Sequence, residues 1–331
     1  MKANQIFIFI FFCMLLISSC KKDIEPIKIL RFEQDLFDPN TLNNPNHYKN
    51  LQKKYGPFYQ VFAQDMLNIS EEEQAYGFQP SMSKFVGFPA IKQLKFEVDS
   101  VFPQLTELET TLAKAMDIYK TEFPKTNIPC FVTFISEFGY AQVNVDTVVG
   151  IGLDMYLGSN YALYPALEFP DFMAQKLRKE YILPNTIKSI GIGQFESQLI
   201  DKRFMAMMLF EGKLRYFMKE LLPQVHDSLI FGYSPIQLNW AQENEGMVWK
   251  HLIESKMLLS VNPSQYMRYF NDGPFTIATG VPQESAPAIG IYTGYKIICK
   301  YMENKQSASL KDLMLNANWD EILRDSNYRP K

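Results

Sequence analysis

The sequence predicts an α+β fold that is mainly helical, with one small central antiparallel sheet at about residues 130–157 packed by helices. Apolar residues recur at three- and four-residue spacing before residue 124 and again after residue 170, which is the helical period. Between these regions, "CFVTFISEF" and "TVVGIGLDMYLG" are rich in β-branched and aromatic residues, as strands are. Of the 331 residues, 47% are hydrophobic, so the chain is long enough to bury a large core.

The helices expected before the sheet come from two stretches. In "HYKNLQKKYGPFYQVFAQDML", the spacing of Leu51, Tyr55, Phe58 and Phe62 is helical. A second helical pattern extends from Pro89 to Phe123, and Pro124 ends it. After Pro170 the expected helices are "DFMAQKLRKEY", "LIDKRFMAMMLFEGKLRYFMKELL", "PIQLNWAQENEGMVWKHLIESKML", "NPSQYMRYF", "AIGIYTGYKIICKYMEN" and "SLKDLMLNANWDEILRDS".

The N-terminus has the features of a lipoprotein signal. A positive residue, Lys2, precedes an apolar run at residues 6–17, and "LISSC" follows with Cys20 as its last residue. Small residues before a cysteine are typical of bacterial lipoprotein processing, so we expect residues 1–19 to be cleaved and Cys20 to carry fatty acyl chains such as palmitate. The alternative is an ordinary cleaved secretory signal. Residues 20–28 are then a tether, and residues 29–331 form one domain.

This signal predicts the location of the protein. The apolar run is too short to cross ~30 Å of hydrocarbon, whereas two or more acyl chains anchor a protein firmly. We therefore expect a periplasm-facing domain held at the cell envelope by Cys20. Lys21, in place of an aspartate after the cysteine, favours the outer membrane.

Charge and cysteine content exclude some classes of protein. The net charge is -3 and no stripe of Lys and Arg is present, so a nucleic-acid partner has no electrostatic basis. Besides Cys20, the mature chain keeps Cys130 and Cys299, both in apolar surroundings. A disulfide between them and two buried free thiols both remain open.

The most unusual local feature is Glu211-Gly212 inside an otherwise apolar helical segment, "MMLFEGKLRYFM". A buried glutamate is costly unless it is paired, and a helical glycine loses about 1 kcal/mol relative to alanine. One interpretation is a metal ligand on a core helix, with the glycine admitting a neighbouring backbone. The favoured interpretation is a core carboxylate paired with a lysine or arginine.

Catalytic zinc lacks its usual ligands in this sequence. The three histidines are His47, His226 and His251, and no two of them have the HExxH spacing that places two imidazoles on one helix face. We therefore expect no cofactor and no catalytic metal. The alternative is a divergent metallopeptidase or other hydrolase that uses oxygen ligands such as Glu211 and Asp154.

A second candidate surface is the segment that carries Trp240, Glu243, Glu245 and Trp249. Acidic and aromatic residues together are compatible with a calcium site or with a partner-binding helix. A solvated helix face with aromatic anchors is the simpler interpretation.

Several ordered motifs resemble one family. They are "LDMYLG", "IDKRFMAMMLFEGKLRYFMKELLP", "GYSPIQLNWAQENEGMVWKHLIESKMLLS", "YFNDGPFT", "ESAPAIGIYTGYKIICKYM" and "SNYRPK". Together, from Cys20 to Lys331, they resemble the gliding-motility lipoprotein B (GldB) family of Bacteroidetes-type bacteria. One departure is "DGPF" where "APF" is expected. The segment "FEGKLRYF" is also similar to the glutamate helix of zincin-like peptidases, which implies a degenerate zincin-like scaffold without HExxH.

The resemblance implies a lipid-anchored envelope protein that is required for gliding and linked to type IX secretion of adhesins. Its expected partners are the membrane, through Cys20, and other gliding and secretion proteins. It implies no catalytic residues, so Glu211, Gly212 and Asp154 become structural residues of the core. The hydrolase is the first alternative to this assembly role. The second alternative is an envelope lipoprotein that captures a small ligand.

Overall fold

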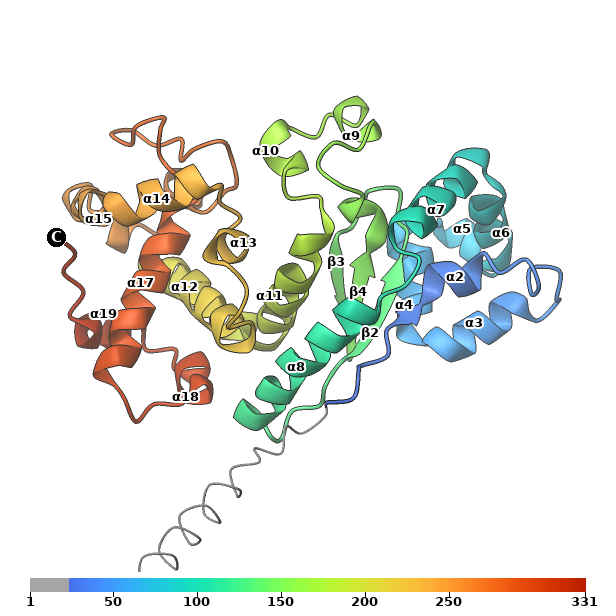
Figure 1. Ribbon diagram of the computed structural model, residues 1–331, viewed down its shortest axis with the longest axis horizontal. Coiled ribbons are helices and arrows are strands. Elements are labelled where there is room, and N and C mark those ends of the chain that lie inside the picture. The colour runs from blue at the N-terminus through green and yellow to red at the C-terminus, as the bar shows by residue number, and fades with distance from the viewer. Residues whose placement is uncertain (1–23) are drawn as a thin grey trace, which may run out of the picture.

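Helices cover both faces of a four-stranded sheet in the computed structural model, which describes residues 24–331 (Figure 1). The predicted signal peptide and Cys20 lie outside the described residues. The strands are β1 (Leu30–Arg31), β2 (Cys130–Phe134), β3 (Gln142–Val145) and β4 (Val148–Gly152). The mainly helical class that the sequence predicts is confirmed, and the sheet lies in the predicted region except for β1.

The prediction of an antiparallel sheet is wrong, because the sheet is mixed. Its order is β1-β2-β4-β3, with β2 parallel to both β1 and β4 and only β3 antiparallel to β4. The prediction treated β2 and β4 as consecutive strands and missed β3 in "QVNV". Since β3 forms the hairpin with β4, the chain must cross the end of β4 between β2 and β3, which leaves β2 and β4 parallel.

That crossing explains the glycines of "GIGLD". A Cβ on Gly152 would lie 1.9 Å from the backbone oxygen of Tyr140, so only glycine lets the crossing loop pass over the end of β4. A Cβ on Gly150 would lie 2.5 Å from a methyl group of Val143 and 3.0 Å from the ring of Phe58. Both glycines are therefore needed for close packing, and neither marks a phosphate-binding loop.

The first helices pack on one face of the sheet and form a core of their own with it. Its aromatic centre contains Phe32, Phe58, Phe62 and Phe134, which contact one another edge to face or at tilted angles. The helices on this side are α2 (Phe32–Leu36), α3 (His47–Tyr55), α4 (Pro57–Val61), the π-helical turn Phe62–Met66, α5 (Glu71–Gln74) and α6 (Gln79–Gly87).

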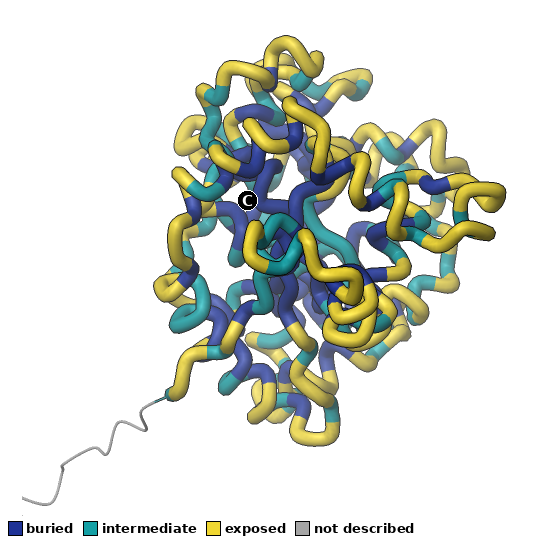
Figure 2. Tube along the Cα trace, turned by 90° about the vertical axis from the view of Figure 1, so that its right-hand side faces the viewer, coloured by how far each residue is buried: buried dark blue, intermediate teal, exposed yellow. Residues whose placement is uncertain are grey.

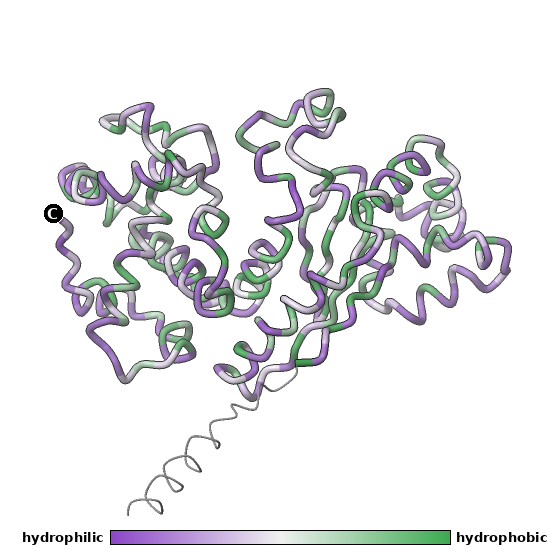
Figure 3. The backbone as a smooth tube through the Cα atoms, in the orientation of Figure 1, coloured by the Kyte–Doolittle hydropathy of each residue, from purple (hydrophilic) through white to green (hydrophobic). Residues whose placement is uncertain are grey.

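The second and larger core lies on the other face of the sheet and extends through the C-terminal helices. It includes Phe131, Val149 and Ile151 of the strands, and Figure 3 shows hydrophobic stretches along the strands and the helices beside them. The long helices of this half are α7 (Pro89–Val101), α8 (Thr106–Glu122), α11 (Ile182–Phe195), α12 (Phe204–Leu221) and α17 (Ile289–Asn304). The shorter ones are α9 (Leu163–Ala166), α10 (Asp171–Ala174), α13 (Asp227–Phe231), α14 (Pro235–Glu243), α15 (Glu245–Glu254), α16 (Pro263–Tyr266), α18 (Leu310–Leu315) and α19 (Trp319–Ser326).

Three expected helices are divided in the structure. Pro103 lacks an N–H and separates α7 from α8, within the stretch predicted as one helical pattern. Asn244 separates α14 from α15. In the last segment, Ser309 caps α18 and Asn318 caps α19, so each helix begins at its own side-chain cap.

Helix α11 was not predicted. Its sequence contains Pro184 and two glycines, which are signals against a helix. The proline lies in the first turn, where a missing N–H is tolerated, and Gly191 lets α12 approach: a Cβ there would lie 2.9 Å from Leu214. The glycine therefore serves the packing of α11 on α12.

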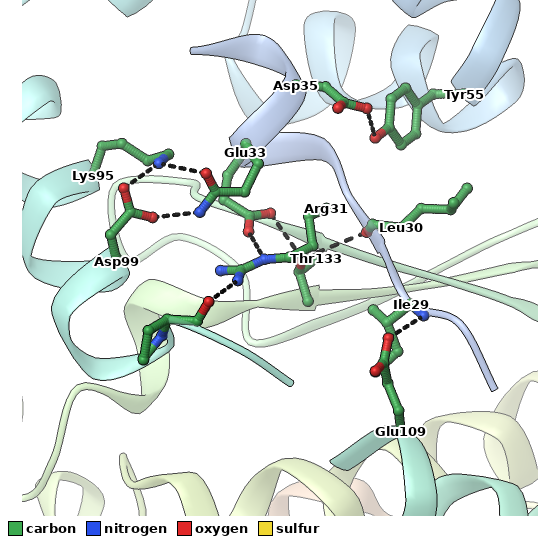
Figure 4. A network of polar contacts seen from close by, with 12 residues as sticks. Ile29, Leu30, Arg31, Glu33, Asp35, Tyr55, Lys95, Asp99, Glu109 and Thr133 are labelled. Atoms are coloured by element: carbon green, nitrogen blue, oxygen red, sulfur yellow. Dashed lines mark hydrogen bonds and ion pairs between the residues drawn. The ribbon is translucent and has the colours of Figure 1, made fainter. Parts of the chain in front are cut away.

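A buried charge network fastens the start of the described chain to the sheet (Figure 4). Glu33 is buried, and it accepts hydrogen bonds from Arg31 Nε at 2.7 Å and from Thr133 Oγ1 of β2 at 2.8 Å. Burial raises the pKa of Glu33, and the charge of Arg31 opposes that rise. Just before it, the N–H of Ile29 donates to Glu109 of α8 at 3.0 Å. The chain is thus bonded to the domain from about this point onward.

Figure 2 shows the buried residues gathered inside the molecule and the exposed residues on its outer turns. Among residues 24–331, none of the helices has the length and apolar character required to cross a membrane. Cys130 and Cys299 are free thiols, so no disulfide joins them. Neither of the two alternatives left open by the sequence describes Cys130 fully, because its free thiol lies at the exposed first position of β2.

Candidate functional site

Helix α12 is central to the C-terminal half, and Glu211 lies on it in an ion pair. Its Oε2 accepts a hydrogen bond from Arg215 Nη1, one turn later, at 3.1 Å. The Arg215 side chain is only 6% exposed and that of Glu211 17%. The basic partner that the sequence predicts for Glu211 is therefore Arg215. A carboxylate held in this way has one of its oxygens directed at a guanidinium.

Gly212 lies where α12 crosses α17. A Cβ on Gly212 would lie 2.3 Å from the backbone carbon of Gly294, and a Cβ on Gly294 would lie 1.9 Å from the backbone oxygen of Met208. The two helices thus meet backbone to backbone, with a glycine from each at the contact. This is the close approach that the sequence suggests for Gly212, with α17 as the neighbour.

The charges around Glu211 do not suit a metal ion. Lys188 of α11 lies in the electrostatic field of both Arg215 and Glu211. Two cations beside one carboxylate repel a divalent cation. Within residues 24–331, no group of three or more His, Cys, Asp and Glu side chains is arranged to hold a metal.

The histidines have other contacts. The Nε2 atom of His47 lies 3.3 Å from the backbone oxygen of Leu36, and His226 caps α13. The Nε2 atom of His251 lies 2.9 Å from the hydroxyl of Tyr269. The three rings thus contact different parts of the fold.

Asp154, the other oxygen ligand of the hydrolase hypothesis, is fully buried and lies in the turn after β4. Its Oδ2 accepts hydrogen bonds from the backbone N–H groups of Ser136 at 3.0 Å and Phe138 at 2.7 Å. Glu137 and Phe138 both have positive φ, so the carboxylate holds a strained stretch of the crossing loop. Its Oδ1 is buried without a hydrogen-bond partner. These contacts give Asp154 a structural role, because it holds the loop between β2 and β3 that crosses the end of β4.

The pKa of Asp154 leads to a testable pH dependence. Burial raises it from 3.8 to about 6, although the two backbone hydrogen bonds oppose the rise. Between these values the folded state keeps the proton that the unfolded state loses, so this group lowers stability as pH rises from about 4 to about 6. At 1.36 kcal/mol per pKa unit, the loss over the whole titration is about 3 kcal/mol.

Asp154→Asn cannot titrate and keeps an acceptor oxygen for the loop. In urea titrations, the free energy of unfolding of the variant minus that of the wild type should therefore rise by about 2 kcal/mol between pH 4 and pH 6.5. Asp146→Asn is the matched control: Asp146 lies exposed in the turn between β3 and β4, and its substitution should leave the pH profile parallel to that of the wild type. A parallel profile for Asp154→Asn would refute the assignment.

The segment proposed as an interaction helix forms two helices, α14 and α15. Three of its four candidate residues pack against the rest of the protein. Glu245 lies 3.5 Å from Lys296 of α17, and Trp249 packs edge to face on Tyr328 near the C-terminus. Trp240 is half-buried against the large core, while Glu243 is exposed. A Cβ on Gly246 would lie 2.2 Å from the backbone oxygen of Lys331, so this helix receives the end of the chain.

A cavity of about 220 Å³ lies beside Arg215, between α11, α12, α13 and α17. Its charged lining residues are Lys176, Lys188, Arg215 and Asp272, and most of the remaining wall is apolar. Sequence reasoning missed this cavity, because its residues come from five separate segments of the chain. The one available signal was "NDGPF", the departure from the family pattern, which contains Asp272.

Comparison with known proteins gives one match. No curated protein and no solved structure matches the chain. A family model described as "Gliding motility protein GldB" matches residues 18–330. The match covers nearly the whole chain, including the sheet, α12 and the cavity.

Proposed function

The chain belongs to the GldB family of gliding motility proteins, and on that premise we propose that it is a lipid-anchored envelope component of the gliding machinery that acts by binding other proteins. The family is one of motility lipoproteins and is not a known enzyme family. We further propose that Cys20 carries the lipid, that the domain faces the periplasm from the outer membrane, and that the protein supports secretion of adhesins.

The observation that carries the non-catalytic part of the proposal is the setting of Glu211. A metallopeptidase needs its glutamate free to bind a metal or to act as a base. Here the carboxylate is paired with Arg215 and lies near a second cation, Lys188. Metal analysis of protein purified without chelators separates the two classes. A stoichiometric zinc ion together with peptide hydrolysis would favour a divergent zincin-like enzyme.

The position of the first bonded residue limits how far the domain extends from the membrane. The N–H of Ile27 lies 3.4 Å from the backbone oxygen of Glu109 in α8, and the chain enters β1 three residues later. Seven residue steps separate Cys20 from Ile27, which span at most about 25 Å at ~3.6 Å per residue. In this proposal the tether is short, and the domain meets its partners close to the lipid surface.

The proposal predicts that Cys20→Ala releases the protein from membranes and abolishes gliding. A thiol is required to receive the lipid, and none of the helices of residues 24–331 could cross a membrane in its place. We expect the wild-type chain to sediment with membranes and to restore spreading and adhesin export to cells that lack it. The variant should remain in the soluble fraction and restore neither.

Cys13→Ala is the matched control, since it removes a cysteine from the apolar run of the predicted signal and leaves Cys20 in place. It should behave as the wild type in both assays. If Cys20→Ala still sedimented with membranes, the lipid anchor would be disproved. If it were released and yet supported gliding, anchoring would not be part of the function.

A further inference from the structure

The cavity beside α12 concentrates positive charge among lining residues that are otherwise mostly apolar. Three of its four charged lining residues are cations, contributed by the segment after α10 (Lys176), by α11 (Lys188) and by α12 (Arg215). Asp272 is the one acid in the lining, and its Oδ1 lies 2.5 Å from Lys176 Nζ. Glu211 lies outside the lining but pairs with Arg215.

Two of the cations keep unused hydrogen-bond donors. The Nε of Arg215 is buried without a hydrogen-bond partner, and the residue as a whole is only 5% exposed. Lys188 has no hydrogen-bond or ion-pair partner among the described residues. Buried polar groups are normally satisfied, and donors left unpaired beside a cavity are suited to a ligand with acceptor oxygens.

The electrostatics of Lys188 agree with this geometry. Its pKa is lowered to about 8, first by the charge of Arg215 and then by burial, while Glu211 and Asp272 oppose the change and Lys176 adds to it. A lysine whose proton affinity is lowered by a neighbouring cation is stabilised by an anion placed between the two. The same field repels a divalent metal.

We propose that this cavity binds a phosphate group, as free phosphate or as the ester of a small molecule or lipid headgroup. Phosphate presents several acceptor oxygens, so it can accept bonds from three cations on three different elements, whereas a carboxylate has only two oxygens. The volume of about 220 Å³ admits a phosphate and a short substituent, and the apolar wall would contact that substituent. This inference goes beyond the proposed role in motility and does not depend on it.

The test is titration calorimetry on the full-length chain in detergent, at fixed ionic strength, with inorganic phosphate and with glycerol 3-phosphate. Both should bind, and Lys188→Met should weaken binding about ten- to a hundredfold, the effect of one charge-assisted hydrogen bond. Tighter binding of the ester would identify esters as the source, and equal binding would identify free phosphate; either result supports the site. Binding in the wild type should also weaken as pH rises through about 8, where Lys188 loses its proton.

Two further variants make the result specific. Lys179→Met removes an exposed lysine outside the cavity and should bind as the wild type does. Asp272→Asn releases Lys176 from its ion pair and should tighten binding, a gain that general damage to the fold would not produce. The proposal is wrong if the wild type binds neither phosphate, if acetate binds as tightly, or if Lys188→Met binds phosphate like the wild type.

Discussion

Gly294→Ala should lower the free energy of unfolding by about 3 kcal/mol or more, at or above the usual upper limit for overpacking. The added methyl group would lie 1.9 Å from the backbone oxygen of Met208 and 2.7 Å from its backbone carbon. Backbone atoms cannot rotate away as a side chain can, so α12 and α17 must separate along their contact. The gain of about 1 kcal/mol in helix propensity from alanine does not offset that separation. Urea denaturation followed by circular dichroism measures the change.

Gly87→Ala provides the matched control. Gly87 is the last residue of α6, it is exposed, and a Cβ there would meet no atom within 4 Å. The same substitution at this position should leave stability unchanged or raise it by up to about 1 kcal/mol. Equal stability of Gly294→Ala and the wild type would show that α12 and α17 do not meet at these glycines.

Arg31→Met should lower the free energy of unfolding by about 3–5 kcal/mol at neutral pH, the range found when one partner of a buried ion pair is removed. Glu33 is then a fully buried carboxylate whose remaining side-chain partner is Thr133 (Figure 4). Its pKa, already raised by burial, rises further without the guanidinium. Because the folded state then keeps a proton that the unfolded state loses, the defect should shrink as pH falls toward the unfolded pKa of the carboxyl.

Two variants test whether the effect comes from the buried charge. Lys54→Met removes an ion pair with Asp35 in which the side chains are 49% and 36% exposed, and it should cost no more than about 1 kcal/mol. Arg31→Met combined with Glu33→Met removes both charges and should recover much of the stability lost in the single variant. A loss for Arg31→Met that stayed the same at pH 5 and pH 7.5 would contradict the electrostatic explanation.

The strands show which features of the sheet local sequence patterns predict and which they do not. β2 and β4 were predicted from their β-branched and aromatic residues, and both lie where expected. Their relative direction was not predictable, because it depends on β3 and on the loop that crosses Gly152. Backbone N–H groups of that loop donate hydrogen bonds to Asp154, which lies beyond β4 in the sequence. A window of local sequence contains none of these pairings.

The candidate site also has some features that the sequence predicted and others that depend on contacts between distant residues. The apolar sequence around Glu211 indicated a central helix that needed a basic partner for its acid, and Arg215 one turn away is that partner. The role of Gly212 was visible only in outline, since the neighbour that requires it, Gly294, is 82 residues further along the chain. Glu245 and Trp249 were predicted as candidate residues of an interaction surface. In the structure, Glu245 lies close to Lys296 of α17, and Trp249 packs on Tyr328 near the C-terminal end.

By itself the sequence determined the mainly helical class and the family, and it predicted a lipoprotein signal ending at Cys20, because these depend on periodicity, residue order and motifs that are local or collinear. The tertiary structure alone decided the mixed sheet, the crossing of α12 and α17 and the cationic cavity. Each of these arises where residues distant along the chain come into contact, as Lys188, Arg215 and Asp272 do around one cavity. Local propensity does not encode such contacts; they follow from the packing of helices and strands that bury a shared core.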